Sequence, residues 1–285
     1  MSEEKRRSKG PRAPLRIGLG KIDNEFQYSG TDELLKVEEN LISYNKSLIN
    51  RVVTICALNI SPYSDLTGQS SFPNPKKNYS VLDFGAGIGT FSSLFYEETG
   101  NKPDCLEIDN ELSKHIQARG FQCFNNLSDI NKKYDLIFTF NVLEHILDDE
   151  DALMKINNYL KPGGILIVYV PALQLLYSNL DKSLGHYRRY SKKDLETKVV
   201  NANFHIGKCH YNDSLGSFVG IIFKLLNYKI DECSIKESSY KFYDTILYPI
   251  SRMFDFFGLK YCFGKNLFLF AKKKQNQVGL PEDGL

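Results

Sequence analysis

The spacing of apolar residues divides the chain into distinct zones. Between residues 31 and 59, apolar side chains recur at helical spacing behind Thr31, whose side chain suits a helix N-cap, so we expect an amphipathic helical segment. Residues 61–78 are rich in Ser, Pro, Asn and Lys, a composition typical of a linker or a long loop. From residue 80 the pattern changes to short apolar runs that alternate with helical patterns.

This alternation predicts an α/β fold with a parallel sheet. The expected strands are 81–84, 105–108, 121–124, 136–140, 165–170, 204–211 and 267–271, and the expected helices between them are 91–98, 111–119, 148–160 and 192–201. The first strands are apolar on both faces, which is typical of a sheet covered by helices on both sides. Two more segments, 215–226 and 243–257, are aromatic, apolar and helical in spacing.

Composition limits the classes of function. With 285 residues, 42% hydrophobic and 25% charged, the chain can bury a sizeable core, and a net charge of +2 gives no indication of a nucleic-acid partner. The six cysteines are scattered without metal-like spacing, as free thiols in a reducing cytoplasm are. We find neither a secretory signal nor an apolar run of about 18 residues, so we expect a cytoplasmic protein.

Most of the basic excess lies at the start of the chain. We expect residues 1–24 to form a solvated, disordered tail, and the alternative is contact with an anionic surface. The basic residues there are Lys5, Arg6, Arg7, Lys9, Arg12 and Arg16, opposed by Glu3 and Glu4.

The sharpest motif is the glycine-rich turn that follows the first strand. Gly85, Gly87 and Gly89 form G-x-G-x-G, whereas dinucleotide-binding folds use G-x-G-x-x-G. Glycines let the backbone turn tightly and approach a ligand without interference from a Cβ atom. Asp83 stands two positions before the first glycine, where a carboxylate disfavours a pyrophosphate and favours a cationic cofactor.

This motif resembles motif I of class I S-adenosylmethionine-dependent methyltransferases, and the resemblance extends from about residue 25 to residue 273. It implies S-adenosyl-L-methionine as the cofactor, S-adenosyl-L-homocysteine as the product, and a Rossmann-like seven-stranded sheet of order 3-2-1-4-5-7-6. The loop residues Asp83, Gly85, Ala86, Gly87 and Gly89 would bind the methionine part of the cofactor. Asp83 would contact its amino acid portion directly or through water.

Further cofactor contacts are predicted downstream. A carboxylate at the end of the second strand can accept hydrogen bonds from both ribose hydroxyls, and between Glu107 and Asp109 we choose Asp109 because it follows the apolar end of the strand. Asn125, Asn126 and Asp129 are candidates for the adenine site, and we prefer Asn126.

Residues 134–145 resemble the fourth strand and following loop of the family, which would place Asn141 and Val142 near the cofactor. The Lys-Pro-Gly-Gly run at 161–164 also matches.

His145 is the first candidate for acid–base chemistry. A methyl sulfonium is already a strong electrophile, so the chain must mainly position the acceptor, and a hydroxyl acceptor gains from a nearby general base such as histidine. His145 follows Glu144 in a segment that resembles the ubiquinone-biosynthesis O-methyltransferases, and both a catalytic and a structural role remain open. In that family a Glu–His pair can also assist metal binding, but no acidic partners at matching spacing are evident, so we predict no metal.

His186 is the second candidate, in a polar loop that follows the fifth strand. We predict that residues 181–190 form the acceptor site, with His186 as base or orienter, Arg188 or Arg189 holding an anion, and Asp181 and Tyr190 beside them. The alternative is a charged surface loop that caps the next helix.

The D-x-x-x-G-H-x-R-R-Y block at 181–190 resembles a bacterial group of methyltransferases associated with glycosyltransferases and surface-polysaccharide genes. The group shares Tyr44-Asn45 and the run 263–266, so Tyr44 joins the acceptor-binding candidates. This resemblance implies a small-molecule acceptor, a sugar or a lipid-linked glycan.

Residues 212–264 form an insertion before the last strand, where the fold needs only a short hairpin. Its apolar stripes indicate packing onto the domain. The alternative is a lid or a peripheral membrane contact that recognises a lipid-linked acceptor, with basic residues for an anionic interface. These basic residues are Lys224, Lys229, Lys241, Arg252 and Lys260.

The predicted organisation is a tail (1–24), a helical cover with linker (25–78), a methyltransferase core (79–211 and 265–274), the insertion (212–264) and a flexible tail (275–285). The predicted reaction is O-methylation, with N- or C-methylation left open and quinone or phenol O-methylation as the nearest rival. A dinucleotide-dependent oxidoreductase and a catalytically silent scaffold are rivals from different classes, and Asp83 with the G-x-G-x-G spacing argues against the oxidoreductase. No pattern indicates the oligomeric state.

Overall fold

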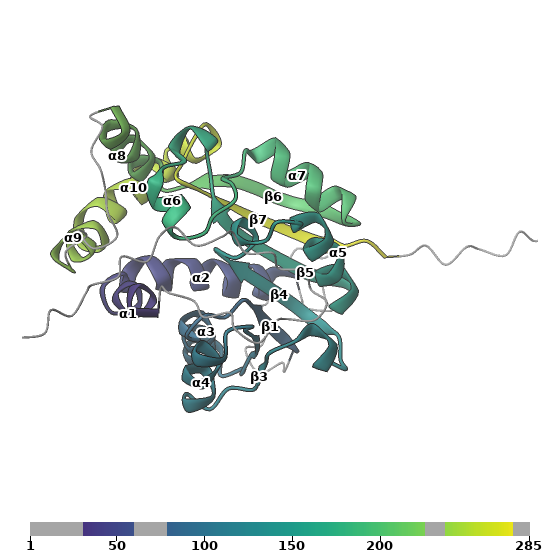
Figure 1. Cartoon of the computed structure of the whole chain (residues 1–285). Coiled ribbons are helices and arrows are strands. Elements are labelled where there is room, and N and C mark those ends of the chain that lie inside the picture. The colour runs from purple at the N-terminus through teal and green to yellow at the C-terminus, as the bar shows by residue number, and fades with distance from the viewer. Residues whose placement is uncertain (1–30, 60–78, 226–236, 276–285) are drawn as a thin grey trace, which may run out of the picture.

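A computed structural model describes residues 31–59, 79–225 and 237–275 of the chain (Figure 1). The predictions for residues 1–24, for most of the linker and for the C-terminal tail lie outside the described residues. The described residues form a seven-stranded sheet in the order β3-β2-β1-β4-β5-β7-β6, with helices on both faces (Figure 1). This is the predicted Rossmann-like methyltransferase architecture.

The sheet is parallel except at β7, which runs antiparallel to both β5 and β6. Its strands are β1 (Val81–Phe84), β2 (Asp104–Leu106), β3 (Cys123–Phe124), β4 (Tyr134–Phe140), β5 (Leu160–Pro171), β6 (Phe204–Asn212) and β7 (Asn266–Lys273). Strand β5 starts five residues earlier than predicted, since the Lys-Pro-Gly-Gly run belongs to it and shifts the register against β4.

Alternate residues of the strands belong to two apolar cores, one on each face of the sheet. Along β5, Ile165, Ile167 and Tyr169 belong to the core under α2 (Ile42–Asn59) and α3 (Thr90–Thr99). The intervening Leu166, Val168 and Val170 belong to the core under α5 (Asp149–Tyr159) and α7 (Lys192–Asn201). This period of two places both faces of the sheet under helices, as the apolar strand sequences predicted. Helix α4 (Asn110–Ala118) packs near the β3 edge.

The N-terminal helical segment is broken at Leu41 into α1 (Thr31–Asn40) and α2. Asp244, two hundred residues away, accepts hydrogen bonds of 2.8 Å from the backbone N–H groups of Ser43 and Tyr44. Because the first N–H groups of a helix have no partner inside it, the Asp244 carboxylate caps α2.

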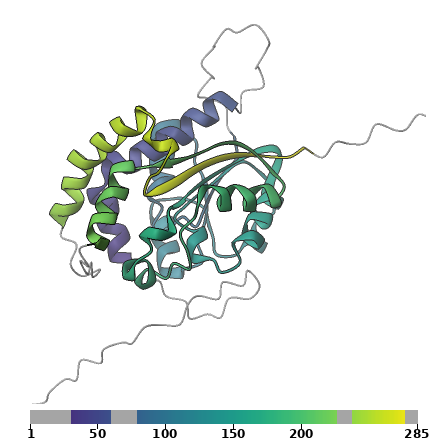
Figure 2. The same cartoon turned by 90° about the horizontal axis from the view of Figure 1, so that it is seen from above.

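The insertion consists of α8 (Ser214–Leu225), α9 (Glu237–Phe242), a π-helical turn (Tyr243–Leu247) and α10 (Tyr248–Phe256). These helices gather at one end of the molecule beside α1 and α2 (Figures 1 and 2). Tyr248 and Asp255 are buried, and Asp255 accepts from the backbone N–H of Asp213 at 2.9 Å. In contrast, Phe256 and Phe257 are 80% and 74% exposed. The insertion therefore packs onto the domain and also presents an apolar outer surface.

None of the described helices combines the length and the apolar character needed to cross a membrane.

Candidate active site

The glycine loop joins β1 to α3 in a backbone conformation that favours glycine. Gly85, Gly87 and Gly89 have φ angles of 78°, 58° and 84°. A Cβ atom at Gly85 would lie 2.4 Å from Cγ2 of Val142, so the loops that follow β1 and β4 are in close contact. On the other side of the loop, Leu34 of α1 lies 3.5 Å from where a Cβ atom of Gly87 would be. The structure thus brings Val142 to the glycine loop and covers the loop with α1.

Asp83 lies at the base of the loop, only 2% exposed, where it accepts a 2.7 Å hydrogen bond from the Ser92 hydroxyl of α3. Burial raises the pKa of Asp83 to about 7, against the lowering effect of Ser92 and with a further increase from Glu107. A buried carboxylate next to the loop is electrostatically suited to a cationic ligand.

The two ribose candidates lie in different surroundings, and the choice of Asp109 stays a prediction. Asp109 lies at the N-cap of α4, where Oδ1 accepts from the backbone N–H groups of Glu111 and Leu112 at 2.8 and 3.1 Å. Glu107 is the first residue after β2, and its carboxylate accepts from the N–H of Gly87 at 2.8 Å and from the N–H of Asp109 at 3.0 Å. Glu107 is therefore the acidic group that contacts the glycine loop.

Burial also raises the pKa of Glu107 to about 7, although the two N–H groups that it accepts lower it. Two buried carboxylates, Asp83 and Glu107, thus flank a loop whose glycines leave room for a ligand. A molecule with a sulfonium and an ammonium group fits this arrangement, whereas a pyrophosphate would be repelled by it.

The remaining cofactor candidates lie around this edge of the sheet. Asn125 donates to the backbone carbonyl of Glu107 at 2.9 Å, while the exposed Asn126 donates to Asp129 at 3.3 Å. Asn141 directly follows β4, has a left-handed φ of 54° and donates its backbone N–H to the Tyr169 carbonyl at 2.8 Å. Their roles toward adenine and the cofactor remain predictions.

A second cluster of polar side chains forms where the loops after β4 and β5 meet. Glu144 and His145 lie in a 3₁₀ turn (Leu143–His145), and His186 follows α6 (Asn179–Ser183). The rings of His145 and His186 meet edge to face with centroids 4.6 Å apart. The structure therefore brings together the two histidines that the sequence singled out.

Asp181 orients this cluster. Its carboxylate is 1% exposed, and Oδ1 lies 3.1 Å from Nδ1 of His186 and accepts from Nε of Arg189 at 2.8 Å. Burial alone would raise the pKa of Asp181, but His186 and Arg189 hold it well below its usual range. Burial, with help from His186, lowers the pKa of His145 to about 3, which favours its neutral form.

Glu144, which the sequence named only as the neighbour of His145, lies in the same cluster. Its side chain is 0% exposed, and neither carboxylate oxygen has a hydrogen-bond partner among the described residues. Burial raises the pKa of Glu144 to about 7, while the charges of His186 and Arg189 lower it. The burial of this carboxylate could not be predicted from the sequence, because it depends on loops that are far apart in the chain.

Arg188 and Tyr190, two of the predicted acceptor residues, contact Asp149 of α5 and not the histidine cluster. Asp149 receives the Tyr190 hydroxyl at 2.7 Å, and Arg188 pairs with the same carboxylate at 2.7 Å. Tyr190 is completely buried. This placement favours a structural role for both residues, in which they connect the loop to α5. Of the residues in the 181–190 block, Asp181, His186 and Arg189 belong to the histidine cluster.

Tyr44 lies in a separate aromatic cluster. Its hydroxyl is 2.7 Å from that of Tyr169, and its ring contacts those of Tyr243 and Tyr248. Tyr44 thus connects α2, the sheet and the insertion, and its role in acceptor binding stays a prediction.

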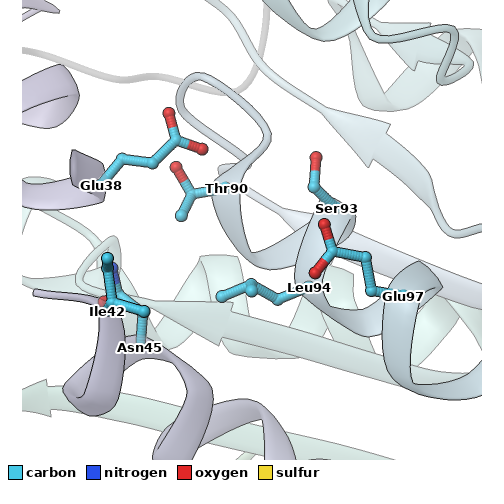
Figure 3. A pocket seen from close by; sticks show the side chains of 7 residues that line it. All are labelled: Glu38, Ile42, Asn45, Thr90, Ser93, Leu94 and Glu97. Atoms are coloured by element: carbon cyan, nitrogen blue, oxygen red, sulfur yellow. The ribbon is translucent and has the colours of Figure 1, made fainter.

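A pocket separates the N-terminal helices from α3 (Figure 3). None of the predicted site residues lines it; the lining residues are Glu38, Ile42, Asn45, Thr90, Ser93, Leu94 and Glu97. The Glu38 carboxylate is held by Arg119 of the α4 C-terminus in two hydrogen bonds of 2.5 and 2.7 Å. The pocket therefore lies where the N-terminal helices pack against the rest of the domain.

Comparison with solved structures agrees with this fold. A methyltransferase from Archaeoglobus fulgidus superposes with a TM-score of 0.51 at 16% identity, covering 85% of this chain and 99% of that chain. One from Clostridium acetobutylicum gives a TM-score of 0.51 at 13% identity, covering 85% and 98%. Both are S-adenosylmethionine-dependent methyltransferases, and at these identities the likeness concerns the fold alone.

Curated relatives resemble part of the chain. A probable S-adenosylmethionine-dependent methyltransferase of Mycolicibacterium smegmatis is 25% identical over 148 residues, which cover 49% of this chain and 55% of the relative. Malonyl-[acyl-carrier protein] O-methyltransferase 1 of Ilyobacter polytropus is 28% identical over 147 residues, covering 46% and 54%. The match spans about half the length of these relatives.

The fold, the glycine loop and its carboxylates define a class I S-adenosylmethionine-dependent methyltransferase domain. The family model described as a methyltransferase domain matches residues 57–207, more than half of the chain. The chain belongs to this methyltransferase family, whose cofactor is S-adenosylmethionine.

Proposed function

We propose that this protein methylates a hydroxyl oxygen of a small-molecule acceptor. The glycine loop with Asp83 would hold the methionine part of the cofactor, and Glu107 would take the ribose position in place of Asp109. When bound, S-adenosylmethionine supplies an electrophilic methyl group: a C–O bond forms to the acceptor while the C–S bond breaks and leaves its electron pair on sulfur, giving S-adenosylhomocysteine.

The observation that carries this proposal is the Asp181–His186 pair beside His145. Asp181 fixes Nδ1 of His186 at 3.1 Å, which leaves Nε2 directed to other partners. The ligand site of an open α/β sheet lies at the carboxyl ends of its strands, and both the histidine cluster and the glycine loop lie there. His186, oriented by Asp181, would accept the proton of the acceptor hydroxyl at Nε2 as the C–O bond forms.

A sugar or a lipid-linked glycan is the acceptor class that the GHxRRY block supports by resemblance. The outer face of the insertion supports a lipid-linked form, because exposed Phe256, Phe257 and Tyr261 lie near the basic Arg252 and Lys260. Aromatic and basic side chains on one surface suit a peripheral contact with an anionic membrane. This contact and the division of the chain into cover, core and insertion are part of the proposal.

The test is a His186→Ala variant, with His115→Ala on the exposed side of α4 as the matched control. Binding of S-adenosylmethionine is measured by calorimetry, and transfer of a labelled methyl group is measured on panels of sugars, glycolipids and phenols. We expect cofactor binding in all three proteins, and transfer only in the wild type and the control. Unchanged transfer by His186→Ala would refute the role of His186, and labelling of phenols alone would favour the quinone-type rival. A wild type that binds no cofactor would favour a scaffold.

A further inference from the structure

Three side chains of the histidine cluster present metal-ligand atoms to one another. In residues 31–59, 79–225 and 237–275, a single group of this kind is found: Glu144, His145 and His186, each offering one ligand atom, with all of these atoms within 4.8 Å of one another. They come from two different loops, after β4 and after α6, so the fold and not a local sequence motif assembles the group.

The Glu144 carboxylate is an independent sign that something is bound there. It is 0% exposed and its two oxygens have no hydrogen-bond partner among the described residues. Burying an unpaired carboxylate is costly unless a cation or a proton compensates it. The guanidinium of Arg189, whose charge acts on Glu144, donates instead to Asp181 at 2.8 Å and to the Ala172 carbonyl at 3.3 Å. The described residues thus give the Glu144 carboxylate no hydrogen-bonded cation.

The hydrogen bonds behind the cluster match those of metal-binding histidines. A histidine that binds a metal usually donates its second ring N–H to a carboxylate, which fixes the tautomer and the ring orientation. Asp181 is placed at 3.1 Å from Nδ1 of His186 and leaves Nε2 for a ligand. Asp181 also accepts from Arg189, which reduces the repulsion that this guanidinium would exert on a cation.

The sequence led us to predict no metal, because the third ligand atom, on His186, lies about forty residues from the Glu144–His145 pair in the chain. From the structure we propose that Glu144, His145 and His186 bind a divalent transition-metal ion of the Zn²⁺ class. Two imidazoles and one carboxylate are ligands that Zn²⁺ prefers, whereas Mg²⁺ and Ca²⁺ prefer oxygen ligands throughout. Three protein ligands leave a position for an acceptor oxygen. This inference rests on the proposed function: a hydroxyl coordinated there would lose its proton to solvent more readily, because the ion lowers its pKa.

The experiment measures metal binding by itself. The full chain, without an affinity tag and freed of metal with a chelator, is titrated with Zn²⁺ in competition with a chromophoric chelator, and with Co²⁺ while the visible spectrum is recorded. We expect one ion per chain and the intense Co²⁺ bands of a four-coordinate site. Glu144→Gln and His186→Asn should lose the site, and Asp181→Asn should weaken it by about 10- to 100-fold. His115→Asn, at the exposed side chain on α4, should bind like the wild type.

Circular dichroism and thermal melting show whether each variant is folded, and Glu144→Gln conserves shape while removing the charge. Stoichiometric binding that depends on Glu144 and His186 supports the proposal. A wild type that binds no Zn²⁺ or Co²⁺, or one whose binding is unchanged in both variants, overturns it. If the metal is absent but His186→Ala loses methyl transfer, the proposed function survives and His186 is the base. If the metal binds but no acceptor is methylated, the proposed function fails and the metal site stands.

Discussion

The contact between Gly85 and Val142 allows a graded test of the glycine loop. In Gly85→Ala the new methyl group meets two obstacles. The φ of 78° is unfavourable for any residue with a Cβ atom, which costs roughly 1–2 kcal/mol. The Cβ atom would also lie 2.4 and 2.8 Å from the two methyl carbons of Val142, and overpacking of this kind adds about 1–3 kcal/mol.

Two further variants separate these effects. Gly100 has a φ of 68° and no atom within 4 Å of the position that a Cβ atom would take, so Gly100→Ala reports the backbone strain alone. In Gly85→Ala/Val142→Ala the two obstructing methyl groups are gone and the closest atom of residue 142 is its Cβ at 3.2 Å, so most of the overpacking is removed while the backbone strain remains. Unfolding in urea gives the free energy of unfolding of each variant, and calorimetry gives the affinity for S-adenosylmethionine.

We expect Gly85→Ala to lose about 2–5 kcal/mol of stability together with cofactor binding, since the displaced loop is the proposed binding surface. The double variant Gly85→Ala/Val142→Ala should lose about 1–3 kcal/mol less stability than the sum of the two single variants. The reasoning would be refuted if Gly85→Ala cost no more than Gly100→Ala, or if the two substitutions at 85 and 142 were additive.

Two other variants test contacts of buried carboxylates. Burial raises the pKa of Asp83 to about 7, above the value near 3.9 of an unfolded chain, so its protonated form favours folding. The contribution of Asp83 to the free energy of unfolding is therefore complete below about pH 4 and is lost as the pH rises to about 7, a fall of up to about 4 kcal/mol. In Asp83→Asn we expect a smaller fall, measured by urea unfolding at a series of pH values. Equal pH profiles of the wild type and the variant would contradict the assignment. Asp244→Ala should lower the free energy of unfolding by about 1 kcal/mol, because it removes the cap of α2, and should speed hydrogen exchange at the backbone of Ser43 and Tyr44. Glu237→Ala, at an exposed side chain, should change neither quantity. A melting temperature of Asp244→Ala equal to that of the wild type would exclude the cap.

The core of the fold could be predicted because its signals are local. Short apolar runs mark the strands, and the three glycines after β1 mark a turn whose backbone has positive φ angles. The break at Leu41 could not be predicted in this way, because the apolar pattern continues across it and the cap that stabilises α2 comes from Asp244 in the insertion.

The sequence indicated the kinds of residue at the candidate site, but not all of their contacts. The choice of Asp109 over Glu107 depended on where β2 ends, and the strand ends at Leu106, so that Asp109 becomes the helix cap. The sequence around it, Asp-Asn-Glu-Leu, carries that capping signal. The partner of Arg188 and Tyr190 could not be found, since Asp149 lies about forty residues away in the chain.

The Asp244 cap has a mechanical consequence. Helix α1 covers the glycine loop through Leu34, and α1 meets α2 at the break beside Ser43 and Tyr44, the two residues that Asp244 holds. The position of α1 over the glycine loop is therefore set from a break whose α2 side is held by a residue of the insertion, more than one hundred residues beyond the loop in the chain. Loss of the Asp244 carboxylate would release the first turn of α2 and, with it, the contact of Leu34 with the loop.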